Sequence, residues 1–377
     1  MAGSHPKTGG LEPFYGWYIQ VGRNYTRKTR KNILMKKYKI QIILIFILSS
    51  NLISAQEIYS YEKKISNIEN YISTEIESKN TDANIIIKGT LIEPKKTYDK
   101  IVIIVPGSGK DTRNSHYKLT EQLLENNIAV FRYDERGCGL SSGIFNTVSY
   151  NLNDMTNDLK FVFQNLKNEK KLFDKKFGLI GHSLGGMTTV GLLEKNINPD
   201  FLIQWATPVQ SKGAFIKYQL LTGVNKFEDE LIFKTTEEKI NVIDKINNTI
   251  FENRNDENST LFKKIIKVSK EIGYKKTNYK RFTYANFPSA KEMIKKDFEA
   301  IYKKSPIAIL YIIGTEDKYV ESEKETELLK SFNNSNIVIK KIEGLNHYLN
   351  IGSENIENMY EIDNKAVTEI INWTQKQ

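Results

Sequence analysis

The chain has 377 residues, of which 40% are hydrophobic and 11% aromatic, and its formal net charge is +10. This composition supports a substantial core and excludes a globally disordered protein. Residues 1–55 contain nine Lys or Arg and one Glu, which leaves 46 basic and 44 acidic side chains in residues 56–377. A phosphate-binding surface needs a clustered excess of positive charge, so we predict no nucleic-acid partner.

The basic N-terminal region has an explanation outside the fold. Residues 1–34 have no periodic apolar pattern, and we interpret them as a disordered upstream extension. Three lysines between positions 36 and 39 precede an apolar stretch, residues 40–53, which is too short to span a bilayer comfortably. With the small residues that follow, residues 35–55 are predicted to be a cleaved signal peptide. The mature protein is then secreted or periplasmic, with no stable membrane anchor.

Beyond this leader, runs rich in β-branched residues alternate with segments whose apolar residues recur at helical spacing. Near-continuous apolar strands joined by helical crossovers predict an α/β fold, with a mostly parallel sheet covered by helices on both faces. Ligands bind at the carboxyl ends of the strands in such sheets. Strands are predicted at 83–94, 100–107, 128–137, 176–182, 201–208, 307–317 and 336–344, and helices at 115–127, 152–169, 322–332 and 366–375.

One long segment interrupts this alternation. Residues 209–305 contain no convincing strand and several helical patterns. Because a structureless loop of this length is not expected inside a compact domain, we predict a helical lid insertion. It divides the predicted α/β core into residues 56–208 and 306–377.

A serine between two glycines marks the first candidate catalytic position. In Gly181-His182-Ser183-Leu184-Gly185, a predicted strand gives way to small helix-forming residues. So sharp a turn forces the serine into strained backbone angles, and Gly181 and Gly185 provide the necessary room. Ser183 is therefore predicted to be a nucleophile at a helix N-terminus. A glycine-rich turn that only packs helix on sheet is the alternative.

A serine nucleophile needs a base, and the chain has only four histidines. His5 lies in the extension, His182 should point away from the elbow, and His116 is interpreted as a capping or surface residue of a helix. His347, just past a strand, remains as the predicted base.

The acid should leave a strand end between the serine and the histidine. Asp317 is preferred, because the Gly-x-x-Asp-x-x-Val pattern puts the shorter carboxylate at the loop tip, and Glu316 is the alternative. The interval from Asp317 to His347 fits one helix and one strand.

An oxyanion needs two N–H donors. One is predicted to be the backbone N–H of Leu184, and the second that of Ser108, in the loop after residues 100–107. Gly107 and Gly109 permit close backbone approach there. A phosphate-binding loop is disfavoured, because the segment lacks the required Gly and Lys spacing.

The segment YDERGCGLSSG, residues 133–143, is the remaining signature. Asp134 and Arg136 are expected to tie this loop to the scaffold by a charge-assisted hydrogen bond. Cys138 is the single cysteine, so no internal disulfide forms, and with no second histidine to activate it we predict an inert thiol.

Six segments together resemble the α/β-hydrolase superfamily, and most closely bacterial esterases and serine aminopeptidase-like hydrolases: IKGTLIEP, VPGSGKDTR, YDERGCGLSSG, GHSLGG, GTEDKYV and GLNH. The resemblance covers roughly residues 85–377 apart from the insertion. It implies an eight-stranded, mostly parallel sheet, a Ser183–His347–Asp317 triad and an acyl-enzyme. Pro106-Gly107 replaces the His-Gly of many members, and the His-Gly-Gly-Pro-Gly run of proline iminopeptidases is absent, which argues against a peptidase.

The expected function is hydrolysis of a small-molecule carboxylic ester by a secreted serine hydrolase, without a metal or organic cofactor. An aminopeptidase or a thioesterase on the same triad and a non-catalytic ligand-binding relative are the alternatives. Export argues against coenzyme A thioesters. Aromatic lid residues such as Phe215, Tyr218 and Phe282 are expected to set selectivity. The sequence indicates no particular oligomeric state.

Overall fold

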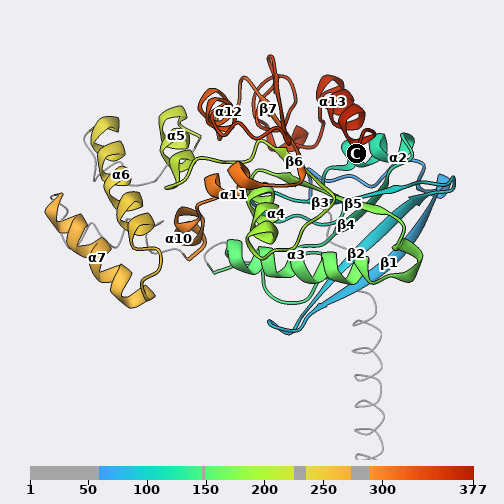
Figure 1. The fold of residues 1–377 in the computed structure, drawn as a ribbon, viewed down its shortest axis with the longest axis horizontal. Coiled ribbons are helices and arrows are strands. Elements are labelled where there is room, and N and C mark those ends of the chain that lie inside the picture. The colour runs from blue at the N-terminus through green and yellow to red at the C-terminus, as the bar shows by residue number, and fades with distance from the viewer. Residues whose placement is uncertain (1–58, 147–148, 225–234, 273–287) are drawn as a thin grey trace, which may run out of the picture. The chain divides into compact units, whose positions relative to one another are not determined.

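Eight strands form one sheet in the part of the chain that the structure describes, residues 59–146, 149–224, 235–272 and 288–377 of a computed structural model. Their order across the sheet is β1-β2-β4-β3-β5-β6-β7-β8 (Figure 1). The strands are β1 (Tyr71–Asn80), β2 (Ile85–Pro94), β3 (Lys100–Val105), β4 (Ala129–Tyr133), β5 (Lys176–His182), β6 (Phe201–Trp205), β7 (Ala308–Gly314) and β8 (Ile337–Ile342).

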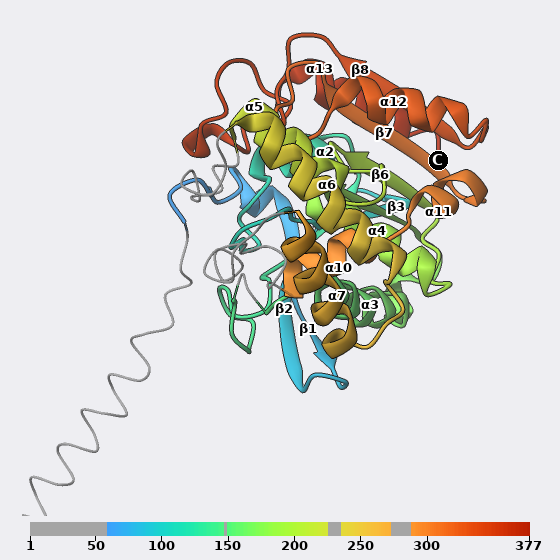
Figure 2. The same cartoon turned by 90° about the vertical axis from the view of Figure 1, so that its left-hand side faces the viewer.

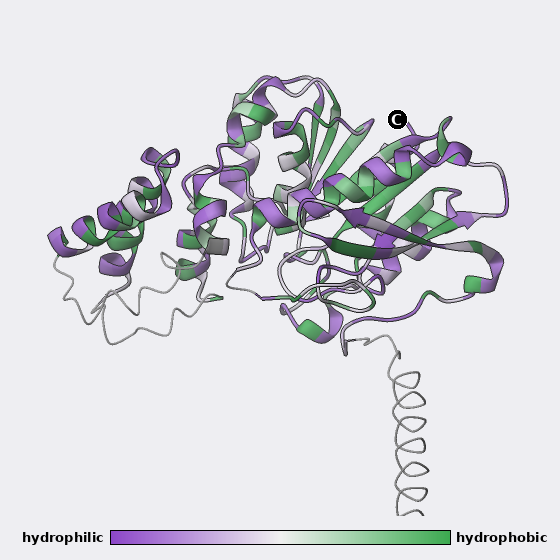
Figure 3. Ribbon diagram, turned by 90° about the horizontal axis from the view of Figure 1, so that it is seen from below, coloured by the Kyte–Doolittle hydropathy of each residue, from purple (hydrophilic) through white to green (hydrophobic). Residues whose placement is uncertain are grey.

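Only β2 runs against its neighbours in this sheet, since it pairs antiparallel with β1 and β4 while the remaining pairs are parallel. The predicted α/β class and mostly parallel sheet are therefore confirmed. The central strands β3 to β7 are almost fully buried, and Figure 3 shows strands of the sheet as strongly hydrophobic ribbons, whereas the edge strand β8 is only partly buried. Covering on both faces explains why their sequences are continuously apolar.

Helices cover both faces of the sheet. α3 (Leu152–Lys167) and α4 (Leu184–Glu194) pack together on one face, and α2 (Tyr117–Glu125) and α13 (Asn364–Thr374) pack together on the other. α12 (Ser322–Ser331) connects β7 to β8. Short 3-10 helices are η1 (Ile68–Asn70), η2 (Lys170–Leu172) and η3 (Ile356–Asn358).

The described parts of the connection between β6 and β7 contain helices and no strand. Its helices are α5 (Ala214–Thr222), α6 (Thr236–Glu252), α7 (Asn258–Glu271), α10 (Pro288–Lys295) and α11 (Glu299–Lys304). α6 contacts α5, α7 and α10, while α10 also contacts α3, so this group lies beside the sheet (Figure 2). Residues 209–305 thus contain the predicted helices, and their role as a lid stays a prediction.

The predicted N-terminal extension, residues 1–34, and the predicted signal peptide, residues 35–55, lie outside the described residues. Residues 56–377 form one compact unit. Among the described helices, none is both long enough and apolar enough to cross a membrane.

Candidate active site

The turn from β5 into α4 places Ser183 in a strained conformation. β5 ends at His182, α4 begins at Leu184, and the serine between them has φ 54° and ψ −116°. Its N–H donates to the carbonyl oxygen of Trp205 at 2.8 Å, and its own carbonyl accepts from the Gly186 N–H at 3.0 Å. Non-glycine residues in such regions cost about 1–3 kcal/mol and cluster at functional sites.

The glycines of this elbow are required by close backbone approach. A Cβ at Gly181 would lie 2.5 Å from the Cα of Gly186, and one at Gly185 would collide with the carbonyl oxygens of Val105 and Pro106. Gly186 is equally constrained, because a Cβ there would collide with the side chain of Thr207. Gly186 was not among the predicted site residues, although it directly follows Gly185 in the Ser-Leu-Gly-Gly run.

The loop after β3 reaches the same edge of the sheet as this elbow. β3 and β5 are parallel neighbours, with Val105 opposite Gly181. A Cβ at Gly107 would lie 3.1 Å from the carbonyl oxygen of His182 and 3.5 Å from the Cβ of Ser183, so the loop passes directly beside the serine. Gly109, with φ +125°, has a backbone conformation that L side chains rarely adopt.

Both predicted oxyanion donors are available. In the described parts of the chain, the backbone N–H groups of Ser108 and Leu184 have no hydrogen-bond acceptor. Leu184 is the first residue of α4, where N–H groups lack intrahelical partners and the helix dipole favours negative charge. The two donors border one cavity together with Ser183.

Asp317 and His347 are joined directly. The Nδ1 atom of His347 lies 2.8 Å from Oδ2 of Asp317, and both side chains are buried. The other carboxylate oxygen of Asp317 accepts from the N–H groups of Tyr319 at 2.7 Å and Val320 at 2.8 Å. Glu316 is exposed, so the geometry favours Asp317 over this alternative.

With Nδ1 bonded to Asp317, Nε2 is the nitrogen of His347 that remains for chemistry. Within the described residues, no hydrogen bond links the hydroxyl of Ser183 to this ring. Catalytic hydrogen bonds are often long in free enzymes and shorten when substrate binds.

Two more histidines, His182 and His116, lie close to this site. His182 Nδ1 is 3.2 Å from His116 Nε2, and the His182 ring centroid lies 5.1 Å from that of His347. Burial lowers the pKa of His116 to about 3 and that of His182 well below its ordinary value, so both rings are neutral at physiological pH. Rings with so low a pKa are poor proton acceptors, so we do not expect either to replace His347 as the base.

His116 occupies the N-cap position of α2, one of the two roles predicted for it, and the other prediction, that it is a surface residue, is wrong. His116 has no exposed area, makes no side-chain cap and has φ 51°. Its ring packs 4.2 Å from that of Tyr360, near the end of the chain. The contact with the Tyr360 ring and the hydrogen bond to His182 explain why His116, a polar residue, is buried.

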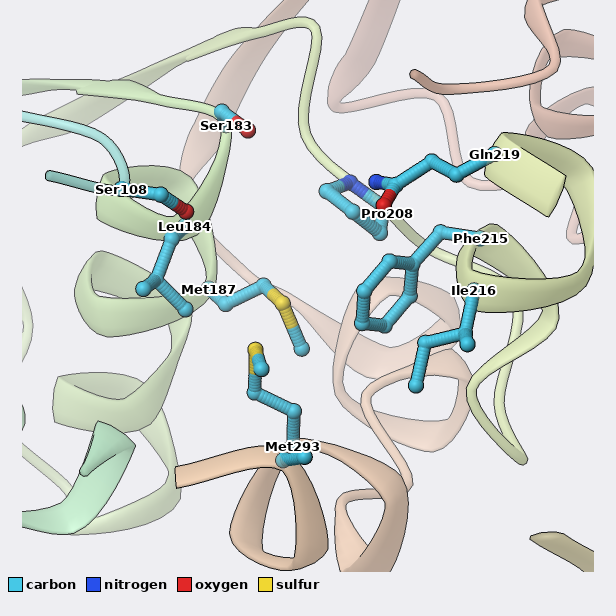
Figure 4. A pocket seen from close by; sticks show the side chains of 10 residues that line it. Ser108, Ser183, Leu184, Met187, Pro208, Phe215, Ile216, Gln219 and Met293 are labelled. Carbon is cyan, nitrogen blue, oxygen red and sulfur yellow. The ribbon is translucent and has the colours of Figure 1, made fainter. Parts of the chain in front are cut away.

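Two cavities meet at the oxyanion donors, and we name them the serine cavity and the Glu135 cavity. They have Ser108, Leu184 and Met293 in common. The serine cavity, of about 170 Å³, is lined by Ser108, Ser183, Leu184, Met187, Pro208, Phe215, Ile216, Gln219, Ala290 and Met293 (Figure 4). The Glu135 cavity, of about 140 Å³, is lined by Gly107, Ser108, Gly109, Glu135, Phe145, Tyr150, Met155, Leu184, Ser289 and Met293.

Comparison with known proteins agrees with this arrangement. A family model described as "Serine aminopeptidase, S33" matches residues 96–352. The chain belongs to this family of α/β hydrolases. No curated protein is detectably similar to it in sequence.

Solved structures share the hydrolase fold. Two crystal forms of an esterase from Pyrococcus furiosus superpose with TM-scores of 0.54 and 0.51, at 16% and 17% sequence identity. The alignments cover 85% and 83% of this hydrolase and 96% and 97% of the esterase chain. At such low identity the likeness shows the fold alone.

The first insertion helix of this hydrolase, α5, is bonded to the loop that holds Asp317. Tyr218 donates its hydroxyl to the carbonyl oxygen of Asp317 at 2.9 Å, and Thr222 donates to that of Lys318 at 2.7 Å. Gln219 Nε2 donates to the carbonyl of Tyr319 at 3.3 Å. Of the three aromatic residues expected to set selectivity, Phe215 lines the serine cavity, Tyr218 makes this bond, and Phe282 lies outside the described residues.

The YDERG loop of the hydrolase is tied to the scaffold as expected, through partners in other elements. Asp134 accepts from the side chain of Arg113, whose Nη2 lies 2.9 Å from Oδ2 of Asp134. Arg136 donates to Asp158 of α3 at 2.9 and 2.8 Å. Cys138 is buried, and burial raises its pKa to about 12, consistent with an inert thiol. Among the described residues, no group of His, Cys, Asp and Glu side chains could hold a metal ion.

Proposed function

We propose that this hydrolase cleaves carboxylic esters through an acyl-enzyme formed on Ser183. One observation supports the proposal above all. The strained serine borders a cavity that Ser108 and Leu184 also line, and among the described residues the backbone N–H groups of these two have no acceptor. A nucleophile beside two unused donors suits acyl transfer, where negative charge develops on a carbonyl oxygen.

In the proposed reaction, His347 Nε2 takes the proton of Ser183 while the hydroxyl oxygen attacks the ester carbonyl. The resulting oxyanion accepts hydrogen bonds from the N–H groups of Ser108 and Leu184. Asp317 holds the His347 ring through Nδ1 and stabilises its protonated form. The imidazolium donates its proton to the departing alcohol, which leaves the acyl group on Ser183. His347 then takes a proton from a water molecule as that water attacks the acyl carbon. The bond from this carbon to the Ser183 oxygen breaks, His347 returns the proton to that oxygen, and the acid is released.

The apolar side chains of the serine cavity are suited to a hydrocarbon part of the substrate. Met187, Phe215 and Ile216 border it, and Figure 4 shows Met187 and Met293 facing each other across its floor. Since α5 and α10 both contribute side chains to this wall, we propose that the insertion of residues 209–305 acts as a lid that sets selectivity.

Peptide bond cleavage is the second candidate, because the matching family is described as a serine aminopeptidase. The same residues would serve, with an amine in place of the alcohol as leaving group. A thioesterase would also use them. A non-catalytic relative is disfavoured, because every residue type required for the reaction is present.

A substrate panel separates these activities. Nitrophenyl esters of increasing acyl length, aminoacyl anilides and an acyl thioester should be compared with wild type, Ser183→Ala and the exposed control Ser331→Ala on α12. We expect ester hydrolysis and fluorophosphonate labelling in wild type and the control, and neither in Ser183→Ala. Turnover of anilides without esters would favour the peptidase, and labelling of Ser183→Ala would assign the nucleophile to another residue.

We also propose that residues 35–55 are a signal peptide and that the mature enzyme is secreted or periplasmic. The charged and apolar pattern of this segment is the support for the proposal. Expression with the native N-terminus in a bacterial host should give an exported protein that begins at Gln56. Full-length protein retained in the cytoplasm would contradict it.

A further inference from the structure

The Glu135 cavity extends from the oxyanion donors to a buried carboxyl group. Glu135 follows β4, has 2% of its surface exposed, and borders this cavity together with Ser108 and Leu184. The serine cavity does not include it. A substrate whose carbonyl oxygen meets the two N–H donors therefore has one neighbouring space lined by apolar side chains and another that contains a carboxyl group.

One oxygen of this carboxyl group is unused. Oε2 of Glu135 accepts from the Asp111 N–H at 3.2 Å, and the Glu135 N–H donates to the Asp111 carbonyl at 3.2 Å. Within the described residues Oε1 has no hydrogen-bond partner, and it is not among the side-chain atoms fully sealed from solvent. Because Glu135 lines the cavity and Oε1 is used by no described group, this oxygen is free to accept a hydrogen bond from a ligand there.

The described residues offer this carboxyl group no ion-pair partner. Neither Glu135 nor its buried neighbours Asp111 and Glu62 form an ion pair with a Lys or Arg of the described chain. Tyr360 donates its hydroxyl to Asp111 at 2.6 Å, and Glu62 accepts from Thr112. The arginines of this region bond elsewhere, since Arg113 is paired with Asp134, Arg132 with the Ser115 carbonyl, and Arg136 with Asp158.

None of the described residues that line the cavity is basic, so its wall supplies no positive charge beside the Glu135 carboxyl group. Burial and the charge of Asp111 raise the pKa of Glu135 well above its ordinary value. A cation in the cavity would stabilise the carboxylate in the way that a salt-bridge partner does. Phe145 and Tyr150 line the same space, and an aromatic face such as that of Phe145 also attracts cations. The Tyr150 ring already carries the guanidinium group of Arg136, 5.2 Å from its centroid.

We propose that the Glu135 cavity binds a cationic group of the substrate, a protonated or quaternary amine, with the Glu135 carboxylate as its counter-ion. This inference rests on the proposed function, since it places the cation next to the ester carbonyl held by Ser108 and Leu184. The preferred substrate is then an ester with an apolar group on one side of the carbonyl and a cationic group on the other.

Isosteric ester pairs test this proposal, because the members of each pair differ in charge and little in shape. Ethyl β-alaninate is compared with ethyl butanoate for a cation on the acyl side. Butyrylcholine is compared with 3,3-dimethylbutyl butanoate for a cation on the alcohol side. In at least one pair we expect kcat/KM to be about tenfold or more higher for the cationic ester. Ratios at or below one in both pairs would overturn the inference.

Glu135→Gln assigns such a preference to the carboxylate, and Glu62→Gln is the matched control. Glu62 is buried in the same acidic group but does not border the cavity. We expect the cationic-to-neutral ratio to fall about fivefold or more in Glu135→Gln and to stay unchanged in Glu62→Gln. The ratio is measured within one preparation, so it does not depend on the folded fraction. A preference that survives in Glu135→Gln would overturn the inference.

Hydrolysis of the neutral esters tests the proposed function separately. If wild type cleaves no ester, the proposed function fails, and the cavity is tested by thermal unfolding of wild type with butylammonium chloride. A rise in Tm above that caused by potassium chloride with 1-butanol supports the cation site. An equal Tm in the two mixtures counts against it, and this measurement needs neither turnover nor a folded variant.

Discussion

Trp205 bonds to both Ser183 and His347. Its carbonyl oxygen accepts from the Ser183 N–H at 2.8 Å, and its indole Nε1 donates to the His347 carbonyl at 3.1 Å. Trp205 is the last residue of β6 and is fully buried. One residue therefore links the loop of His347, the predicted base, to the elbow of Ser183, the predicted nucleophile.

Trp205→Phe removes the indole donor and keeps an aromatic ring. The buried carbonyl of His347 loses its partner, which costs about 1–3 kcal/mol. We expect kcat to fall about tenfold or more on a nitrophenyl ester, with a smaller change in KM, because the histidine is displaced and the cavity is retained. Trp373→Phe on α13 is the control. An unchanged kcat in Trp205→Phe would show that this bond does not position the base.

Asp317→Asn and Glu316→Gln test which of these two carboxylates acts with His347. Asp317→Asn disrupts the bond to His347 Nδ1 and removes the negative charge that stabilises the imidazolium, so we expect kcat to fall by about 10³–10⁴. Glu316→Gln, one residue away on the exposed side of the loop, should retain activity. Steady-state kinetics of both variants, with Tm as a check on folding, make the comparison. The reverse order of effects would assign the acid to Glu316.

We expect the buried Glu325 to make the free energy of unfolding depend on pH. Its buried carboxylate, on α12, accepts from the N–H groups of Val209 at 3.0 Å and Gln210 at 2.9 Å, where the insertion begins. Burial raises its pKa from an ordinary value of 4.5 to about 7. The folded state then holds the proton more tightly than the unfolded state. This contribution to the free energy of unfolding is complete below about pH 4.5 and lost as pH rises through about 7.

Glu325→Gln removes this titration. Relative to wild type, the variant should gain on the order of 1–3 kcal/mol of unfolding free energy between pH 4.5 and pH 8. Urea unfolding of both proteins across this range measures the difference. The exposed Glu327→Gln on the same helix should show no such trend. A difference between wild type and Glu325→Gln that does not vary with pH would contradict the assignment.

Cys138 should be chemically silent in the folded enzyme. Because burial raises the pKa of its thiol to about 12, almost no thiolate exists at neutral pH. We expect maleimide to label the denatured chain and not the native one, and Cys138→Ala to keep its esterase activity. Rapid labelling of native enzyme with loss of turnover would instead place the thiol close to substrate.

The order of strands and helices could be read from the sequence because the central strands are buried on both faces. Their continuous β-branched runs leave little ambiguity, and the observed ends differ from the predicted ones by a few residues. β1, with the sequence YISTEIESKN, was not predicted. This edge strand alternates exposed and buried residues and ends in polar residues, so it lacks a continuous apolar run. Its pairing with β2 gives it structure that its own composition does not indicate.

Local patterns predicted the elbow, and long-range packing decided the exceptions. Ser183 and its glycines form a motif within five residues, so strain and close approach could be inferred directly. His116 depends on Tyr360 and His182, which lie far away in the chain, so its burial has no local signal. Glu135 was passed over for the same reason, since the cavity beside it is made by loops and helices distant in sequence.

The bonds from α5 to the Asp317 loop limit how this enzyme can be re-engineered. Grafting the insertion of a relative onto this core is an obvious route to new selectivity. A chimera with its junction before α5 would discard the side chains of Tyr218, Gln219 and Thr222, which bind three successive peptide groups behind the acid. Placing the junction after Gly223 would exchange the rest of the insertion and leave that support in place.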